Sequence, residues 1–293
     1  MRALIISRVV EPWRVVSAIK IGLEKIGFSY IDQMPVGVVQ RQHLFPYHLI
    51  ITVGWKPEAE FIRLYNELQI IEKKFIAISD GYMQRSADAE PKYSNGYWAV
   101  SYNGLNSYTE NAFHDCPSNR WEQLNIELQP WKKEGKTILI AHQHRQDWLG
   151  GRRTNAFGMM LSLAKLSELP IKIRLHPNHW RNCDFPEFTG HTFMLVHGRR
   201  HTAPIEDDLQ DAYCLLTYDS NAAVDAIIAG VPAYTVGRTI ADKCVKKDFD
   251  LNKPLYYNNR ERWAAWAAYQ QWTIEEIAAG TPFQYLLGRN IVL

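Results

Sequence analysis

The sequence predicts an α/β protein with two doubly wound domains, each a parallel sheet with helices on both faces. Short apolar runs alternate along the chain with longer segments of helical apolar spacing, which is typical of buried parallel strands and their crossover helices. This alternation breaks off and then starts again after the polar segment Pro130-Trp-Lys-Lys-Glu-Gly135, which reads as a linker. The length of 293 residues is also sufficient for two domains of ordinary size.

The first third of the chain alternates strand and helix. Gly27 ends the first helix, and Pro57 lies in the first turn of the second. We expect strands at residues 3–7, 49–53 and 75–79, and helices at 15–26 and 57–73. From Tyr82 to about Asn119 the periodicity dissolves into a stretch rich in Tyr, Asn, Gly and Ser. A connection this long predicts a functional loop or lid, or alternatively an irregular β excursion.

The second half repeats the alternation. We expect strands at residues 137–141, 171–175, 192–196 and 213–217 and one opening at Pro232, with helices at 155–169, 220–229, 240–247, 261–272 and 273–279. The sequence therefore predicts an N-terminal domain at residues 1–130 and a C-terminal domain at residues 131–293.

Composition narrows the class of protein. The 46% apolar residues indicate globular cores, and no run of eighteen apolar residues exists to span a membrane. The apolar stretch at the N-terminus is too short for a signal peptide. Four scattered cysteines without a CxxC pair argue against a disulfide framework or zinc site and favour a reducing cytoplasm. The net charge of +2 neither requires nor excludes a polyanionic partner.

The segment from Tyr213 to Gly237 carries the strongest local signal. It reads as strand, polar turn, helix, Gly-Val-Pro and a second strand, with Ser220 at the start of the helix. A hydroxyl and free backbone N–H groups at the positive end of a helix dipole suit a phosphate. The alternative is an ordinary strand–helix–strand unit in which Ser220 only caps the helix.

Three short motifs follow predicted strands: Ser79-Asp80-Gly81, Arg174-Leu175-His176-Pro177 and Asp219-Ser220-Asn221. In their order and topology they resemble glycosyltransferases of the GT-B type, in particular bacterial sialyltransferases and capsule-polysaccharide transferases. The resemblance implies two Rossmann-like domains that face a cleft, the N-terminal one binding the acceptor and the C-terminal one binding the nucleotide-sugar. It also implies that the terminal helices pack back on the first domain. One departure matters, because the usual acidic-acidic-Gly motif becomes Ser-Asp-Gly here and only Asp80 can carry the acidic role.

The chemistry of glycosyl transfer gives these residues roles. Asp80 is the candidate base that takes the proton of an acceptor hydroxyl, although an Asp before Gly is also a common turn residue. His176 can donate to the departing phosphate, with Pro177 holding the turn, or it can be a packing histidine. Arg174 is either part of the phosphate site or the partner of a carboxylate.

The loops after the first strand of each domain supply further candidates. The resemblance implies that the second-domain loop, with the residues His142, Gln143, His144 and Arg145, faces the nucleotide. Its two histidines have no third ligand at suitable spacing, so we expect no metal. The remaining nucleotide-site candidates are Asp219, Ser220 and Asn221, and the candidates for acceptor binding are Arg8, Glu11 and Arg85.

Donor and acceptor stay open at this point. No convincing acidic DxD pair is present, so the resemblance implies an inverting, metal-independent transfer from a UDP- or CMP-sugar without a further cofactor. The acceptor is a glycan of capsule or lipopolysaccharide, or hydroxymethylated pyrimidine in DNA, since phage DNA glycosyltransferases share the fold. Basic clusters (Arg152-Arg153, Arg199-Arg200-His201, Lys243–Lys247) and an aromatic loop favour DNA slightly. A phage-encoded protein would act in the host cytoplasm. Competing hypotheses are a sugar-nucleotide epimerase and a non-catalytic nucleotide- or nucleic-acid-binding protein.

Overall fold

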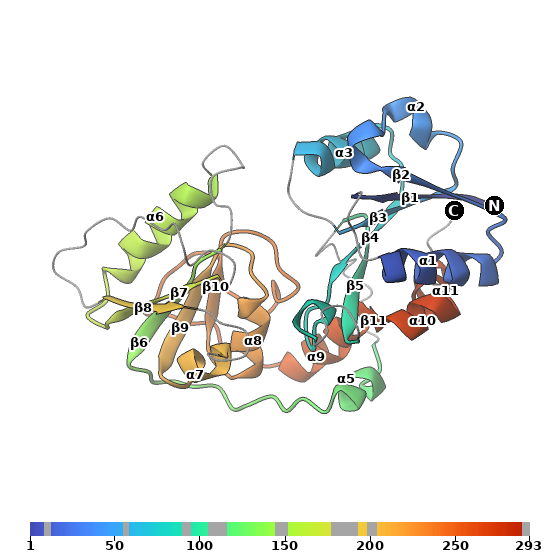
Figure 1. Cartoon of the computed structure of the whole chain (residues 1–293). Helices are drawn as coiled ribbons and strands as arrows, with labels where there is room; N and C mark the ends of the chain where they lie inside the picture. The colour runs from blue at the N-terminus through green and yellow to red at the C-terminus, as the bar shows by residue number, and fades with distance from the viewer. Residues whose placement is uncertain are drawn as a thin grey trace. The chain divides into compact units, whose positions relative to one another are not determined.

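The computed structural model describes residues 1–8, 13–54, 59–89, 95–104, 116–143, 152–176, 193–197 and 204–288. The chain forms two compact units, one of Met1–Cys116 with Trp266–Leu293 and one of Pro117–Ala265 (Figure 1). We expected the first domain at residues 1–130 and the second at 131–293, with terminal helices that pack back on the first. In the structure the chain enters the second unit after Cys116 and returns to the first after Ala265.

The first unit is built on a six-stranded sheet in the order β11-β5-β4-β3-β1-β2. Strands β1 to β4 are parallel, and β5 and β11 extend the sheet in antiparallel fashion beyond β4. Expected strands 3–7, 49–53 and 75–79 correspond to β1, β3 and β4. The strand bounds are β1 Arg2–Ser7, β2 Tyr30–Pro35, β3 Leu49–Val53, β4 Phe75–Asp80, β5 Tyr97–Tyr102 and β11 Gln271–Thr273.

Helices cover both faces of this sheet. Their bounds are α1 Trp13–Lys25, α2 Arg41–Leu44, α3 Ala59–Ile70, α10 Ile274–Ala279 and α11 Thr281–Gly288, with short 3-10 turns at Val36–Val38 and Ser86–Asp88. α1, α10 and α11 pack on the face that carries Ala3 and Ile5, and α2 and α3 on the face that carries Leu4 and Ile6 (Figure 1). α1 crosses α10 so closely that a Cβ on Gly22 would lie 2.0 Å from the Ile277 carbonyl oxygen.

The second unit is built on a five-stranded parallel sheet in the order β10-β9-β6-β7-β8. The strand bounds are β6 Thr137–Ala141, β7 Ile171–Leu175, β8 Phe193–His197, β9 Ala212–Thr217 and β10 Ala233–Thr235. These match the five strands expected from the sequence. Because β6 is followed on one side by β7 and β8 and on the other by β9 and β10, the sheet changes winding direction between β6 and β9.

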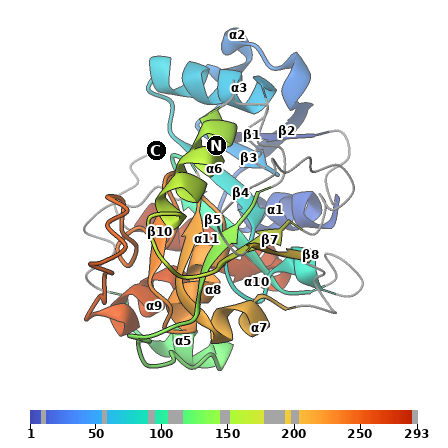
Figure 2. The same ribbon diagram turned by 90° about the vertical axis from the view of Figure 1, so that its left-hand side faces the viewer.

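The helices of the second unit are shorter than expected. Their bounds are α5 Asn119–Leu124, α6 Arg152–Ala164, α7 Ile205–Gln210, α8 Ala222–Ile228 and α9 Arg260–Ala268, the last of which leads back to the first unit. α6 lies over one face of the sheet and α8 over the other (Figures 1 and 2).

Two helix expectations are wrong. Residues 240–247 form turns rather than a helix. Their backbone hydrogen bonds join residues three positions apart, such as that from Cys244 N–H to the Ala241 carbonyl oxygen at 2.7 Å. The helix expected at 261–272 ends at Ala268, and Gln271–Thr273 is strand β11, paired antiparallel with β5. The structure thus places the last residues of the predicted helix in the first unit's sheet.

Candidate functional site

The carboxyl edge of the second sheet carries several of the residues selected from the sequence. His142 and Gln143 follow β6, His176 follows β7, and Asp219 and Ser220 follow β9. Ligands of open α/β sheets bind outside the carboxyl ends of the strands, where the winding direction changes. That position in this unit lies between β6 and β9, and the loops after these two strands therefore form the core of the candidate site.

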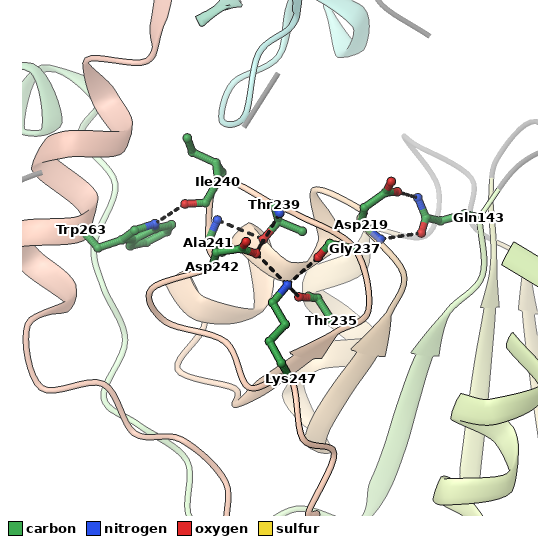
Figure 3. Close-up of polar contacts among 10 residues, drawn as sticks. All are labelled: Gln143, Asp219, Thr235, Gly237, Thr239, Ile240, Ala241, Asp242, Lys247 and Trp263. Carbon is green, nitrogen blue, oxygen red and sulfur yellow. Dashed lines mark hydrogen bonds and ion pairs between the residues drawn. The ribbon is translucent and has the colours of Figure 1, made fainter. Parts of the chain in front are cut away.

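Gln143 and Asp219 join those two loops directly (Figure 3). The Gln143 side-chain nitrogen donates to the Asp219 carboxylate at 2.5 Å, and the Asp219 backbone N–H donates to the Gln143 side-chain oxygen at 2.9 Å. Both residues are half-buried. The two bonds fix the orientation of the amide, because its nitrogen faces a carboxylate and its oxygen faces an N–H group. Gln143 and Asp219 thus form a latch, which we call the switch-point latch, across the change in winding.

A lysine holds the loop that follows β10 (Figure 3). The Lys247 ammonium donates to the Thr235 hydroxyl at 2.6 Å, to the Gly237 carbonyl oxygen and to the Asp242 carboxylate at 2.9 Å. The Asp242 carboxylate also accepts from the Thr239 N–H at 2.9 Å. An ammonium has three hydrogens to donate, and here each has an oxygen to receive it. The loop is therefore held in one conformation by its own residues.

The loops after β9 and β10 are also joined through the backbone. The Gly237 N–H donates to the Tyr218 carbonyl oxygen at 2.7 Å. A Cβ on Gly237 would lie 2.9 Å from the Cβ of Asp219, closer than real Cβ atoms approach. A side chain at 237 would therefore displace the switch-point latch, which gives this glycine a packing reason.

Ser220 stabilises the turn that leads into α8. Its hydroxyl oxygen accepts from the Ala222 N–H at 3.2 Å, and its carbonyl oxygen accepts from the Ala223 N–H at 3.1 Å. The helix that follows has seven residues, and Asn221 stands at its cap position in helical conformation. Ser220 thus supports the turn before α8 and is not at the N-cap position considered for it, and its hydroxyl proton is still available to a ligand.

Arg174 makes the ion pair that the sequence left open. Its guanidinium pairs with the Asp208 carboxylate of α7, and Lys172 pairs with the other oxygen of the same carboxylate at 3.3 Å. The three side chains are at most 16% exposed. The backbone N–H of His142 donates to the Arg174 carbonyl oxygen at 2.9 Å, which continues the hydrogen bonds between β6 and β7 towards the site. Arg174 therefore anchors α7 to β7, whatever else it contacts.

In the first unit, Asp80 ends β4 and is half-buried. The next residue, Gly81, donates its N–H to the Tyr97 carbonyl oxygen. A Cβ at position 81 would lie 2.4 Å from that oxygen, so no side chain fits there. The backbone N–H groups of Tyr82 and Met83 both donate to the side-chain oxygen of Gln271, each at 2.9 Å. The turn after the candidate base is therefore held by contacts to β5 and β11.

The acceptor-site candidates are placed only in part. Arg8 directly follows β1 at the same carboxyl edge as Asp80, with the short strand β3 between their strands. The Arg85 Nε donates to the Tyr82 carbonyl oxygen at 3.2 Å, so Arg85 supports the turn after Asp80. Glu11, His144, Arg145 and Pro177 lie outside the described residues.

Two features are absent from the described part of the chain. No group of three or more His, Cys, Asp or Glu side chains is arranged there to hold a metal ion. No helix there combines the length and the apolar character that crossing a bilayer requires.

Sequence reasoning missed two residues that shape these loops. Lys247 was counted with a basic cluster, and Gln271 was assigned to a helix. Gln271 lies 189 positions from Tyr82, and no local pattern connects the two. The one available signal for Lys247 was the nearby Asp242, which offers the opposite charge five positions before it.

The fold is similar to those of several solved structures. No family model and no curated protein matches the sequence. Among solved structures, the beta Kdo 2,4 transferase of Thermosulfurimonas dismutans KpsC is similar over 91% of both chains, at a TM-score of 0.55 and 13% identity. The beta Kdo 2,7 transferase of the same protein covers 96% of this chain and 99% of that one, at 0.48 and 12%. Methanocaldococcus jannaschii UDP-GlcNAc 2-epimerase covers 99% and 100%, at 0.33 and 10%. The first similarity supports the GT-B type of fold expected from the sequence.

Proposed function

We propose that this chain is a glycosyltransferase that moves a sugar from a nucleotide-sugar to a hydroxyl group of a glycan. The observation that carries the proposal is the gathering of His142, Gln143, His176, Asp219 and Ser220 around the switch point of the second sheet. The fold similarity to a beta Kdo 2,4 transferase supports it, because that similarity covers 91% of both chains at a TM-score of 0.55.

The proposed mechanism divides the work between the units. The loops after β6, β7 and β9 hold the nucleotide, with the Ser220 hydroxyl and the His176 ring donating to its phosphate. Asp80 takes the proton of the acceptor hydroxyl as the new bond to the sugar carbon forms. The bond from that carbon to the phosphate oxygen breaks at the same time, and the nucleotide leaves with the electron pair. Attack from the side opposite the leaving group inverts the sugar carbon, and we propose that no metal takes part.

A glycan acceptor is the better supported of the two acceptor classes. The lean towards DNA rested in part on the Lys243–Lys247 cluster. Lys247 is engaged in the loop after β10, and Lys246 donates to the Lys253 carbonyl oxygen at 2.6 Å and pairs with Asp248 at 3.1 Å. These ammonium groups have internal partners, so they no longer favour a polyanion. The Arg199-Arg200-His201 cluster lies outside the described residues.

The first experiment follows nucleotide release from a panel of CMP- and UDP-sugars, alone and with Kdo-containing glycans or hydroxymethylpyrimidine DNA. Release that depends on a glycan is the expected result. Release that depends on DNA would overturn the proposed acceptor, and a protein that neither binds nor turns over any nucleotide-sugar would overturn the proposed function.

Asp80→Asn separates the base from the binding residues. It removes the proton acceptor and keeps the size of the side chain, so transfer should fall by about 100-fold or more while the Kd for nucleotide stays the same. The matched control is Glu60→Gln, an exposed carboxylate of α3. Full transfer by Asp80→Asn would exclude Asp80 as the base.

A further inference from the structure

We propose that Gln271, a residue of the C-terminal segment, is a positioning residue for Asp80 and that its side-chain oxygen sets the direction of the Asp80 carboxylate. The inference rests on the proposed function, because it takes Asp80 as the base. Gln271 does not touch the reacting atoms in this proposal. It acts through the turn of residues 81–83 that directly follows Asp80.

The contact that carries the proposal is a single oxygen shared by two backbone donors. The N–H groups of Tyr82 and Met83 both point at the Gln271 side-chain oxygen, each at 2.9 Å. Consecutive N–H groups that converge on one point form a concavity that ordinarily takes an anion. Here the concavity is filled by a neutral amide oxygen from another part of the chain.

The three residues that form this contact are buried, which makes the loss of the contact costly. Gln271 is 0% exposed, and Tyr82 and Met83 are each 3% exposed. Water does not have ready access to such groups, and a buried N–H without an acceptor is costly. If the Gln271 oxygen is removed, the turn has to move until its two donors find other acceptors, and Asp80 moves with it.

The pairing of the strands shows where Gln271 lies relative to Asp80. Asp80 pairs with Trp98 of β5, and Trp98 pairs with Trp272 of β11. Gln271 is therefore next to the residue that lies two strands across from Asp80. The turn after Asp80 bends back to β5, where the Gly81 N–H donates to the Tyr97 carbonyl oxygen at 3.1 Å, and this brings the turn within reach of the Gln271 side chain. Through this side chain, the segment that begins at Trp266 contributes to the candidate catalytic end of the first unit.

The test compares Gln271→Met with Gln271→Glu. Methionine has nearly the shape of glutamine without the oxygen, whereas glutamate keeps an acceptor oxygen at the same place, whether ionised or protonated. The matched control is Gln270→Met. Gln270 is the preceding residue, is 7% exposed, and makes no side-chain hydrogen bond among the described residues.

Two readouts are needed, one of which does not depend on activity. Amide hydrogen exchange measures the tether itself. We expect the Tyr82 and Met83 amides to exchange about tenfold faster or more in Gln271→Met, and to regain protection in Gln271→Glu. Steady-state kinetics measures the consequence. We expect kcat to fall by about 10- to 100-fold in Gln271→Met with the Kd for nucleotide unchanged, and to recover largely in Gln271→Glu.

The outcomes separate the two proposals. Unchanged exchange and unchanged kcat in Gln271→Met would overturn the positioning role, and so would a kcat that stays low in Gln271→Glu although protection returns. Equal losses in Gln270→Met would mean that the segment matters only for stability. A wild-type protein without turnover would overturn the proposed function, and with it the role of Asp80. The exchange data would still show in that case whether Gln271 holds the turn.

Discussion

Replacing Gln143 by leucine removes both hydrogen bonds of the switch-point latch. A neutral hydrogen bond contributes about 0.5–1.5 kcal/mol net and one to a charged group about 1.5–3 kcal/mol. The latch has one of each kind, at 2.9 Å and 2.5 Å. Since both residues are half-exposed, water replaces part of this, and we expect Gln143→Leu to destabilise the second unit by about 2 kcal/mol.

A double-mutant cycle with Asp219→Ala isolates the bond between the two side chains. The backbone N–H of residue 219 persists in that variant, so the coupling free energy reports the amide–carboxylate contact alone, and we expect about 1–2 kcal/mol. Urea unfolding followed by tryptophan fluorescence gives the stabilities, and calorimetry gives the Kd for nucleotide. The control is Gln210→Leu, an exposed glutamine of α7. Coupling below about 0.3 kcal/mol would refute the view that these side chains hold the two loops together.

Three further changes test other parts of the structure. Gly81→Ala places a Cβ 2.4 Å from the Tyr97 carbonyl oxygen and should destabilise the first unit by about 1–3 kcal/mol, whereas Gly37→Ala, with nothing within 4 Å, should not; equal Tm values would contradict this. Asp208→Asn leaves two buried cations of β7 without their carboxylate and should cost about 3–5 kcal/mol in urea unfolding, so a loss under 1 kcal/mol would show that the pair is not needed. Complete burial raises the pKa of Cys214 from 9.0 to about 12. Its contribution to stability is therefore fully present below pH 9 and is lost as pH rises towards 12, and Cys214→Ala should flatten that alkaline loss in pH-dependent unfolding; an unchanged slope would argue against a buried thiol.

Much of the fold follows from local pattern. β3, β6 and β7 begin and end at the expected residues. β3 and β6 are mainly apolar runs, as is typical of strands buried on both faces, whereas β7, IKIRL, alternates apolar with basic residues. β2 was missed because it is a largely exposed edge strand whose sequence, YIDQMP, has no such run. β11 was missed because three residues in a Trp-rich stretch carry no strand signal until β5 is beside them.

The wrong helix at residues 240–247 has a physical cause. Ile240, Ala241, Cys244 and Val245 are all buried, and their spacing is that of one helix face. The backbone turns instead, since Asp242 and Lys247 hold the loop through side-chain bonds and Trp263 donates to the Ile240 carbonyl oxygen at 3.0 Å. Helical spacing records which residues are buried, and here tertiary contacts decide the backbone conformation.

Of the candidate site, the sequence could predict positions but not partners. A polar residue directly after an apolar run lies at the carboxyl edge of a sheet, which placed Asp80, His176 and Ser220. The bonds that orient the loops join residues 76 and 189 positions apart, and only the folded sheets bring them together. Arg174 shows the limit most clearly, because its ion pair with Asp208 depends on where α7 packs.

In each unit a glutamine side chain links two segments that are far apart in the sequence, and the chemistry of the amide group explains why. At the turn after β4, the Gln271 side-chain oxygen accepts from two backbone N–H groups at once. At the switch point, Gln143 meets a carboxylate and an N–H group at once, which requires a donor and an acceptor on one planar group. Asparagine offers the same groups on a shorter side chain, so Gln→Asn at either position should fail by reach rather than by chemistry. This distinguishes a tether that spans loops from a side chain that only fills space.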